Sequence, residues 1–254
     1  MKTRITKNKI VGAVLLTMAL FGFAVFVYRL SFYIYEYDAQ YSPVDYGKFN
    51  ILSYFTVQSN FFAYVYFLFA GLAIFGVKKA EKIGFSTTFG ALITLYVLVA
   101  GVTYCAGIPL KLTPPFQWDT AYHRMSAVIQ IYYHMIIPPA ALLLWCFPFR
   151  RERLEKRCVL LSGVYPLVYS LFSLVRGRFS DPVYYPYPFY DPAFVWRAVM
   201  KERPLNLIGA YGLIALLLVF GVGLFMGLCA VLVRIHNARV QSAPPAPAAG
   251  GGAR

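Results

Sequence analysis

Polar side chains that could act together lie near the start of a long apolar stretch. Ser53, Thr56, Ser59 and Asn60 fall on one face of a helix at about 100° per residue, while Gln58 points elsewhere. Ser, Thr and Asn often hydrogen-bond between packed membrane helices. Four of them on one face fit a helix–helix joint and a binding or reaction site equally well.

Two histidines mark a second apolar stretch. His123, Gln130 and His134 are spaced seven and four residues apart, so a continuous α-helix would place them within about 40° on one face. Histidine is the side chain best suited to moving a proton near neutral pH. The alternative is a buried histidine bonded to a neighbour, and His134 is the stronger functional candidate of the two.

The two stretches reach similar depths. At about 1.5 Å per residue, Thr56 lies roughly 8 Å and His134 roughly 10 Å below the outer membrane boundary. If these helices pack together, a hydroxyl meets an imidazole, which is the minimum for nucleophilic acyl transfer. Asn60, Ser59 or Gln130 could then orient the imidazole or stabilise an oxyanion. No acidic residue lies mid-span, so such a unit would be a dyad.

The composition indicates that membrane helices position these groups. Of 254 residues, 59% are hydrophobic and 13% charged, whereas a soluble domain has roughly 45–50% and about 25%. Six stretches have the roughly 20 apolar residues that a span needs, and none alternates as a β-barrel strand would. They are Ile10–Leu30, Ile51–Gly76, Phe85–Ala106, Ala121–Phe149, Val159–Val175 and Leu205–Val233. We therefore expect an all-α, six-helix membrane protein.

The net charge of +14 is distributed unevenly. The two tails and the second and fourth connections carry fifteen basic against three acidic residues. The positive-inside rule then places both termini in the cytoplasm. We expect a multi-pass protein of the cell membrane with tails at 1–9 and 234–254, the latter disordered at its end, around a transmembrane domain at 10–233. No soluble basic–aromatic surface suggests nucleic-acid binding.

The segment between the fifth and sixth spans is rich in tyrosine and proline. Tyr185, Tyr187 and Asp191 lie in it, and Arg176 precedes it. The tyrosines suit an interfacial aromatic belt, while the repeated prolines favour a rigid cap over the outer mouth of the bundle. Arg176 could bind a lipid phosphate, or pair with Asp181 or Asp191.

Other features predict structure rather than chemistry. The four cysteines form no CxxC or Cys/His cluster, so we expect free thiols, no metal site and no cofactor. Gly223 and Gly227, four residues apart, suggest close helix packing in the last span.

Several of these motifs together resemble the bacterial Pr-six-Pr family of six-helix membrane proteins. They are Phe55-Thr56-Val57-Gln58-Ser59-Asn60, His134 followed by Pro138, Tyr165-Pro166, Arg176-Gly177 and Tyr185-Pro186-Tyr187-Pro188-Phe189 with Asp191. The resemblance covers about Ile10–Val233 and implies the fold, with no settled activity.

The layout is more remotely similar to the eukaryotic androgen-induced family, whose members are intramembrane threonine hydrolases of fatty-acid esters of hydroxy fatty acids. That resemblance implies Thr56 as nucleophile and His134 as base, with Ser53 as an alternative nucleophile one turn away. It leads to the hypothesis of a hydrolase of a lipid or fatty-acid ester working in the outer leaflet. The main alternative is a non-enzymatic binder or transporter of a lipid or small molecule, and a third is a membrane protein that regulates a partner. The oligomeric state stays open.

Overall fold

A computed structural model describes residues 9–31, 47–110, 113, 115–146, 152–199 and 207–242. The α-helices are α1 (Lys9–Ser31), α3 (Phe55–Ile74), α4 (Lys78–Gly84), α5 (Thr87–Gly107), α6 (Ala121–Ile131), α7 (Ile137–Cys146), α8 (Arg157–Phe179), α9 (Pro192–Val199) and α10 (Leu207–Gln241). The remaining described elements are the 3₁₀ turns η2 (Lys48–Ser53) and η4 (Pro188–Tyr190) and the π-helical turn η3 (Tyr132–Ile136).

Six helices in these residues are long and apolar enough to cross a membrane, with α6, η3 and α7 together forming one of them. The described elements include no strand. The predicted all-α, six-helix membrane fold is therefore confirmed. The outer parts of the tails, 1–8 and 243–254, lie outside the described residues.

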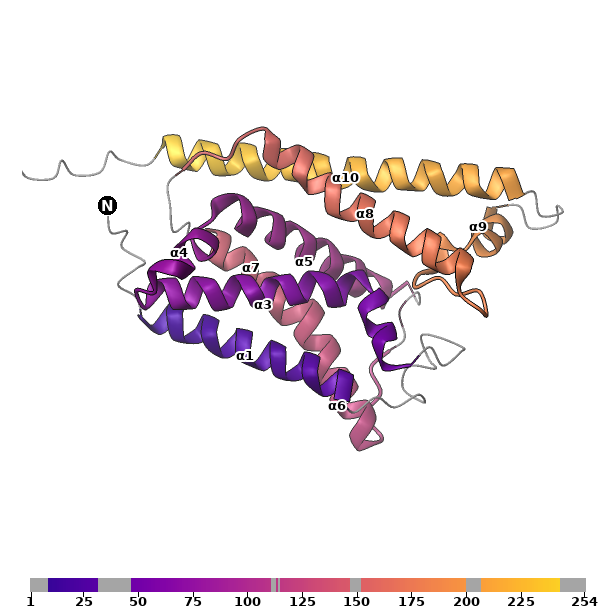
Figure 1. The fold of residues 1–254 in the computed structure, drawn as a ribbon, viewed down its shortest axis with the longest axis horizontal. Coiled ribbons are helices and arrows are strands. Elements are labelled where there is room, and N and C mark those ends of the chain that lie inside the picture. Colours follow the sequence, from indigo (N-terminus) through magenta and orange to yellow (C-terminus); the bar gives the residue numbers. More distant parts are fainter. Residues whose placement is uncertain are drawn as a thin grey trace, which may run out of the picture.

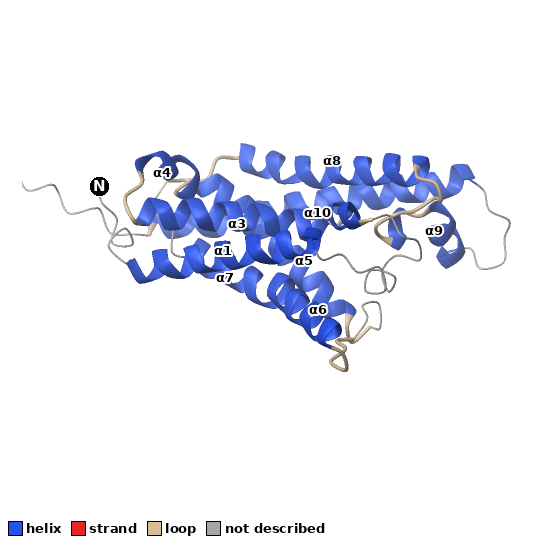
Figure 2. Cartoon of the chain, turned by 60° about the horizontal axis from the view of Figure 1, so that its bottom comes forward, coloured by secondary structure: helices blue, strands red, loops and turns tan. Residues whose placement is uncertain are grey.

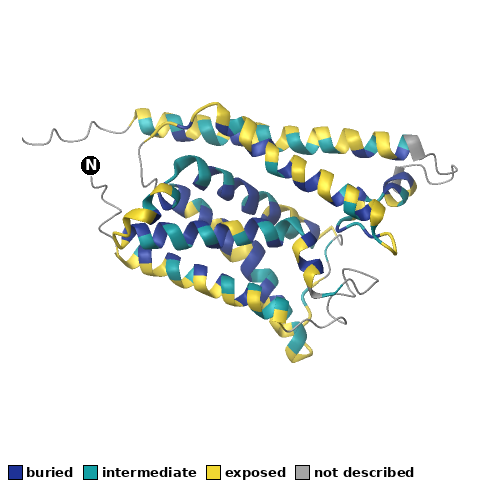
Figure 3. Ribbon diagram, in the orientation of Figure 1, coloured by how far each residue is buried: buried dark blue, intermediate teal, exposed yellow. Residues whose placement is uncertain are grey.

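The helices form an inner group and an outer pair. α1, α3, α5 and α7 pack together, while α8 and α10 lie side by side along one edge (Figures 1 and 2). Much of α8 and α10 is exposed (Figure 3), as lipid-facing helices are. α4 lies at one end of the bundle, and α9 and the start of α6 lie at the other (Figure 1). These ends correspond to the expected cytoplasmic and outer sides.

A glycine of α1 lets a tyrosine ring of α3 pack directly against the α1 backbone. A Cβ added to Gly22 would stand 2.5 Å from the ring of Tyr64, so a larger residue would push the helices apart. Small residues commonly allow this kind of contact between membrane helices. The core that results is strongly aromatic, with the rings of Tyr64 and Tyr132 stacked at 6.1 Å.

Three details differ from the sequence-based expectations. The second span becomes α-helical at Phe55, after a separate 3₁₀ turn, and not at Ile51. α10 continues to Gln241, so residues 234–241 of the expected tail are helical. The expected close packing at Gly223 and Gly227 is wrong within this chain, because a Cβ at either position would meet no atom within 4 Å.

The fourth span is interrupted beside a proline pair. Pro138 has no N–H, so it cannot bond to the carbonyl of His134 four residues earlier. The turn just before it is π-helical, at Tyr132–Ile136. The His134 carbonyl lies against Gly101 of α5, where an added Cβ would be 2.7 Å from that oxygen. Proline and glycine thus set how α5 and the fourth span meet.

Candidate functional site

The polar face of the second span is used mainly for internal bonding. Ser53 lies in η2 and donates to Asn50 Oδ1 at 3.3 Å. Ser59 Oγ and Asn60 Nδ2 both donate to the Thr56 carbonyl, at 3.1 and 2.9 Å. Asn60 Oδ1 is buried and accepts no hydrogen bond within the described part of the chain. Because η2 and α3 are separate helices, Ser53 does not continue the α3 face.

Gln58 points to a different neighbour, as expected. Its Nε2 donates to the Leu52 carbonyl at 2.6 Å, and its Oε1 accepts from the Tyr165 hydroxyl of α8 at 3.0 Å. Tyr169, one turn further along α8, donates to the Ser53 carbonyl at 2.6 Å and accepts from the Phe55 N–H at 3.1 Å. This part of α3 is therefore a joint with α8.

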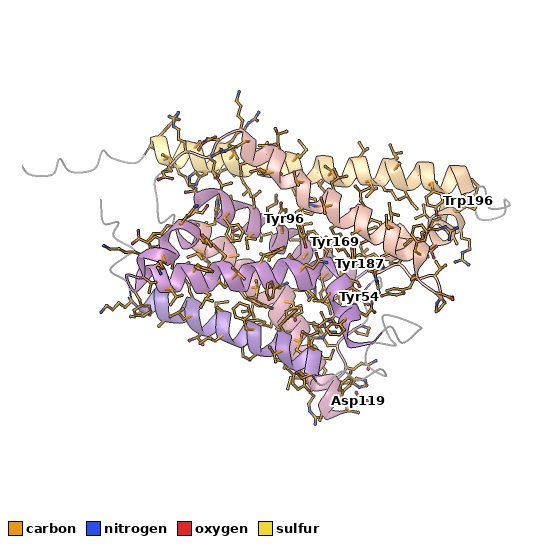
Figure 4. All side chains as sticks on the ribbon, viewed as in Figure 1. Tyr54, Tyr96, Asp119, Tyr169, Tyr187 and Trp196 are labelled. Carbon is orange, nitrogen blue, oxygen red and sulfur yellow. The ribbon has the colours of Figure 1, made fainter. Side chains whose placement is uncertain are left out.

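The tyrosine-rich loop covers this joint from the outside. Tyr187 lies edge-on to Tyr54, with ring centroids 6.0 Å apart, and interacts with the side chain of Thr56. Figure 4 shows Tyr54, Tyr187, Tyr169 and Tyr96 following one another along the region where α3 and α8 meet. Burial raises the pKa of Tyr187 to about 12, and hydrogen bonds that Thr56 donates to the phenol oxygen oppose part of this increase. The rigid-cap interpretation agrees with this arrangement.

The other residues proposed for this segment have structural contacts. Arg176 donates to Asn50 Oδ1 at 2.9 Å, and its guanidinium lies 5.4 Å from the centroid of the Tyr184 ring. Neither Asp181 nor Asp191 forms an ion pair with Arg176. Asp191 instead accepts from the Ala193 N–H at 2.8 Å, at the start of α9.

Tyr185 packs its ring against α8 at Gly177, where no larger residue would fit. Burial raises the pKa of Tyr185 to about 12. The Tyr190 hydroxyl lies 2.7 Å from Ser170 Oγ, also on α8. The loop is thus held to α8 by ring packing and hydrogen bonding, and Tyr185 has no contact that marks it as a ligand-binding group.

Of the expected stripe, His123 and Gln130 lie in the regular helix α6, whereas His134 lies in the π-helical turn η3. His123 lies in the first turn of α6 with its Nδ1 2.6 Å from Asp119 Oδ1. The hydrogen bond from His123 holds the pKa of the exposed Asp119 carboxyl below its ordinary value. His134 lies inside the π-helical turn and is buried. His123 therefore belongs to a surface pair, away from His134.

His134 is buried, with 6% of its surface exposed, and its ring is held on two sides. Its Nδ1 lies 3.0 Å from the Gln130 carbonyl oxygen. Its ring stacks on Tyr104 of α5, with centroids 3.7 Å apart and planes 10° apart. A carbonyl oxygen can only accept, so Nδ1 carries a proton and Nε2 of the neutral ring is the acceptor. Gln130 fixes the His134 ring through its backbone carbonyl.

Among the described residues no hydrogen bond joins Thr56 to His134. Thr56 interacts with Tyr187 on the side facing α8, whereas the His134 ring contacts α5. Comparison with protein-family models, curated proteins and solved structures gives no match. The two family resemblances and the dyad chemistry that they imply therefore stay predictions.

Sequence reasoning missed Tyr104, the ring on which His134 stacks. Tyr104 lies on α5 between Thr103 and Cys105, in a helix without charged or amide side chains, so nothing in the sequence singles it out. Phe116 and Trp118, in the connection before α6, continue from it, with centroid distances of 6.3 Å between Tyr104 and Phe116 and 6.4 Å between Phe116 and Trp118. Trp118 is half exposed, so aromatic rings run from the outer surface to His134.

Proposed function

We propose that this protein binds an amphipathic lipid in the outer leaflet without covalent catalysis, and that His134 receives the polar group of that lipid. The observation that carries the proposal is the held imidazole: the Gln130 carbonyl fixes its tautomer and Tyr104 fixes its plane. In a membrane, an acceptor nitrogen is costly unless a donor reaches it. A lipid hydroxyl would supply the missing donor.

The surroundings of His134 suit access from the bilayer. Met135 and Ile136, the next two residues, are 38% and 45% exposed, and Val102 on α5 is 66% exposed. These apolar side chains face the hydrocarbon in a membrane. A lipid with its chains among them could place a hydroxyl beside His134, while the aromatic series from Trp118 to Tyr104 would contact its apolar body.

Ester hydrolysis requires one more condition. A hydroxyl nucleophile must reach His134 Nε2, but Thr56 interacts with Tyr187. Binding at His134 leaves the contact between Thr56 and Tyr187 in place, whereas hydrolysis by Thr56 and His134 requires that contact to break. Binding is the function that the geometry supports best.

The test is photolabelling of the protein in nanodiscs with a photoreactive, alkyne-tagged diacylglycerol. His134→Phe keeps a ring for the stack on Tyr104 but removes the acceptor nitrogen, so we expect labelling to fall about fivefold, the effect of losing one hydrogen bond of about 1 kcal/mol. His236→Phe is the matched control, because His236 is also buried and also bonds a backbone carbonyl, at 2.9 Å, but lies at the cytoplasmic end.

Equal labelling of the wild type and His134→Phe would contradict the proposal. Release of fatty acid from the probe would also contradict it if the release disappears in both Thr56→Ala and His134→Phe, because that result requires the dyad. Retained labelling with no release in the wild type and Thr56→Ala would support binding.

A further inference from the structure

The cytoplasmic end of α10 extends beyond the membrane. The spanning helix Gly209–Gln241 has 33 residues, about 50 Å at 1.5 Å per residue, against a hydrocarbon core of about 30 Å. Its apolar sequence ends at Val233, and the last two turns contain His236, Asn237 and Arg239. These turns therefore lie at the headgroup level of the cytoplasmic leaflet.

The connection between α7 and α8 is fastened to this end of α10. Asn237 Oδ1 accepts from the Leu154 N–H at 2.8 Å, and Asn237 Nδ2 donates to the Leu154 carbonyl at 3.0 Å. His236 Nε2 donates to the Glu152 carbonyl at 2.9 Å. Arg153, between the two fastened residues, is exposed. The contacts hold the backbone on both sides of the basic residue Arg153 against the end of α10.

Arg239 is held in place by neutral groups, which do not balance its positive charge. Its guanidinium lies 5.4 Å from the centroid of the Trp145 ring, and its Nη1 donates to Cys146 Sγ, a weak acceptor, at 3.7 Å. No carboxylate in the described ranges pairs with Arg239. The buried Trp145 Nε1 also has no acceptor among them. An exposed guanidinium is thus fixed on an aromatic ring with most of its donors unused.

We propose that Arg239, oriented by Trp145 and assisted by Arg153, binds the phosphate of an anionic phospholipid in the cytoplasmic leaflet. Guanidinium groups match phosphate oxygens with paired N–H donors. Basic sites between helix ends on the cytoplasmic side bind anionic headgroups, and that leaflet carries the negative surface potential. A tryptophan at the end of a span suits the same interface. The site is separate from His134, at the opposite end of the bundle.

The protein is extracted from vesicles of phosphatidylcholine and phosphatidylglycerol. Native mass spectrometry then measures how much phosphatidylglycerol stays bound to it. Arg239→Gln is expected to lower retention about fivefold, the effect of one basic residue at the surface. Arg239→Lys, which keeps the charge, should lose less. Arg234→Gln is the matched control, since Arg234 is exposed on the same helix and has no described hydrogen bond or ion pair.

The orienting role of the ring has its own readout. Trp145→Phe keeps an aromatic face for the guanidinium and should retain more phosphatidylglycerol than Trp145→Leu. Equal losses in Arg239→Gln and Arg234→Gln would overturn the proposal, because they would show general attraction to a basic surface. Displacement of the lipid by an equal concentration of inorganic phosphate would also overturn it, in favour of a site for free phosphate.

Discussion

Replacing Gly101 with alanine should destabilise the protein at the contact that shapes the His134 site. A Cβ at this position would stand 2.7 Å from the His134 carbonyl oxygen and 2.7 Å from Pro138 Cγ. Neither neighbour is the end of a flexible side chain, so α5 and the fourth span would have to separate by several tenths of an ångström. Overpacking of this kind costs about 1–3 kcal/mol.

The expected loss is an apparent Tm about 5 °C lower, since about 1 kcal/mol corresponds to about 2–4 °C in a chain approaching this size. Intrinsic tryptophan fluorescence during heating in detergent measures it. Gly227→Ala is the control, because a Cβ there meets no atom within 4 Å and alanine favours helix over glycine by up to about 1 kcal/mol. We expect its Tm to be unchanged or higher. Equal decreases in both variants, or none in Gly101→Ala, would refute the packing argument.

Two further predictions concern the ends of the bundle. Cys158 and Cys229 are buried with their Sγ atoms 3.8 Å apart, so copper–phenanthroline should oxidise them to a disulfide between α8 and α10. Maleimide labelling after denaturation should then show the loss of both thiols. Persistence of both thiols would contradict the pairing. The pKa of Asp119 is lower in the folded than in the unfolded protein, so the ionised carboxyl stabilises the fold. This contribution is present above the unfolded-state pKa and is lost as the pH falls through the folded-state pKa. Because Asp119 is exposed, solvent and salt screen the contribution. An NMR titration of the Asp119 carboxyl should therefore give a midpoint below the ordinary value, and His123→Ala should raise that midpoint. An unchanged midpoint in His123→Ala would contradict the hydrogen bond between His123 and Asp119.

The spans were predictable because hydropathy is a property of single residues summed over a length that the bilayer fixes. The residue at which α3 begins was not predictable, since it depends on a contact between residues far apart in the sequence. The Tyr169 hydroxyl bonds both the Ser53 carbonyl and the Phe55 N–H, at 2.6 and 3.1 Å, where the 3₁₀ turn gives way to α3. More than a hundred residues separate these groups in the sequence, and no local sequence pattern predicts that they bond to one another.

The fourth span departs from a regular α-helix around His134 for a local reason that was partly visible in the sequence. Pro138 stands four residues after His134, so a disturbed helix could be expected there. What the sequence did not reveal is that the disturbance is a π-helical turn that contains His134. The stack on Tyr104 is likewise unpredictable, because it depends on how α5 packs against the bulged turn.

The polar residues of the membrane region divide by what they bond, and this division bears on function. The hydroxyls and amides of α3 are joined to backbone carbonyls or to tyrosines of α8 and the tyrosine-rich loop, so each of these residues already stabilises the fold. His134 differs, because one ring nitrogen is fixed and the other is left to accept. The same orientation would serve a catalytic base or a receptor for a lipid hydroxyl. The choice therefore depends on which hydroxyl reaches that nitrogen, and a hydroxyl arriving from the bilayer need not displace Tyr187 from Thr56.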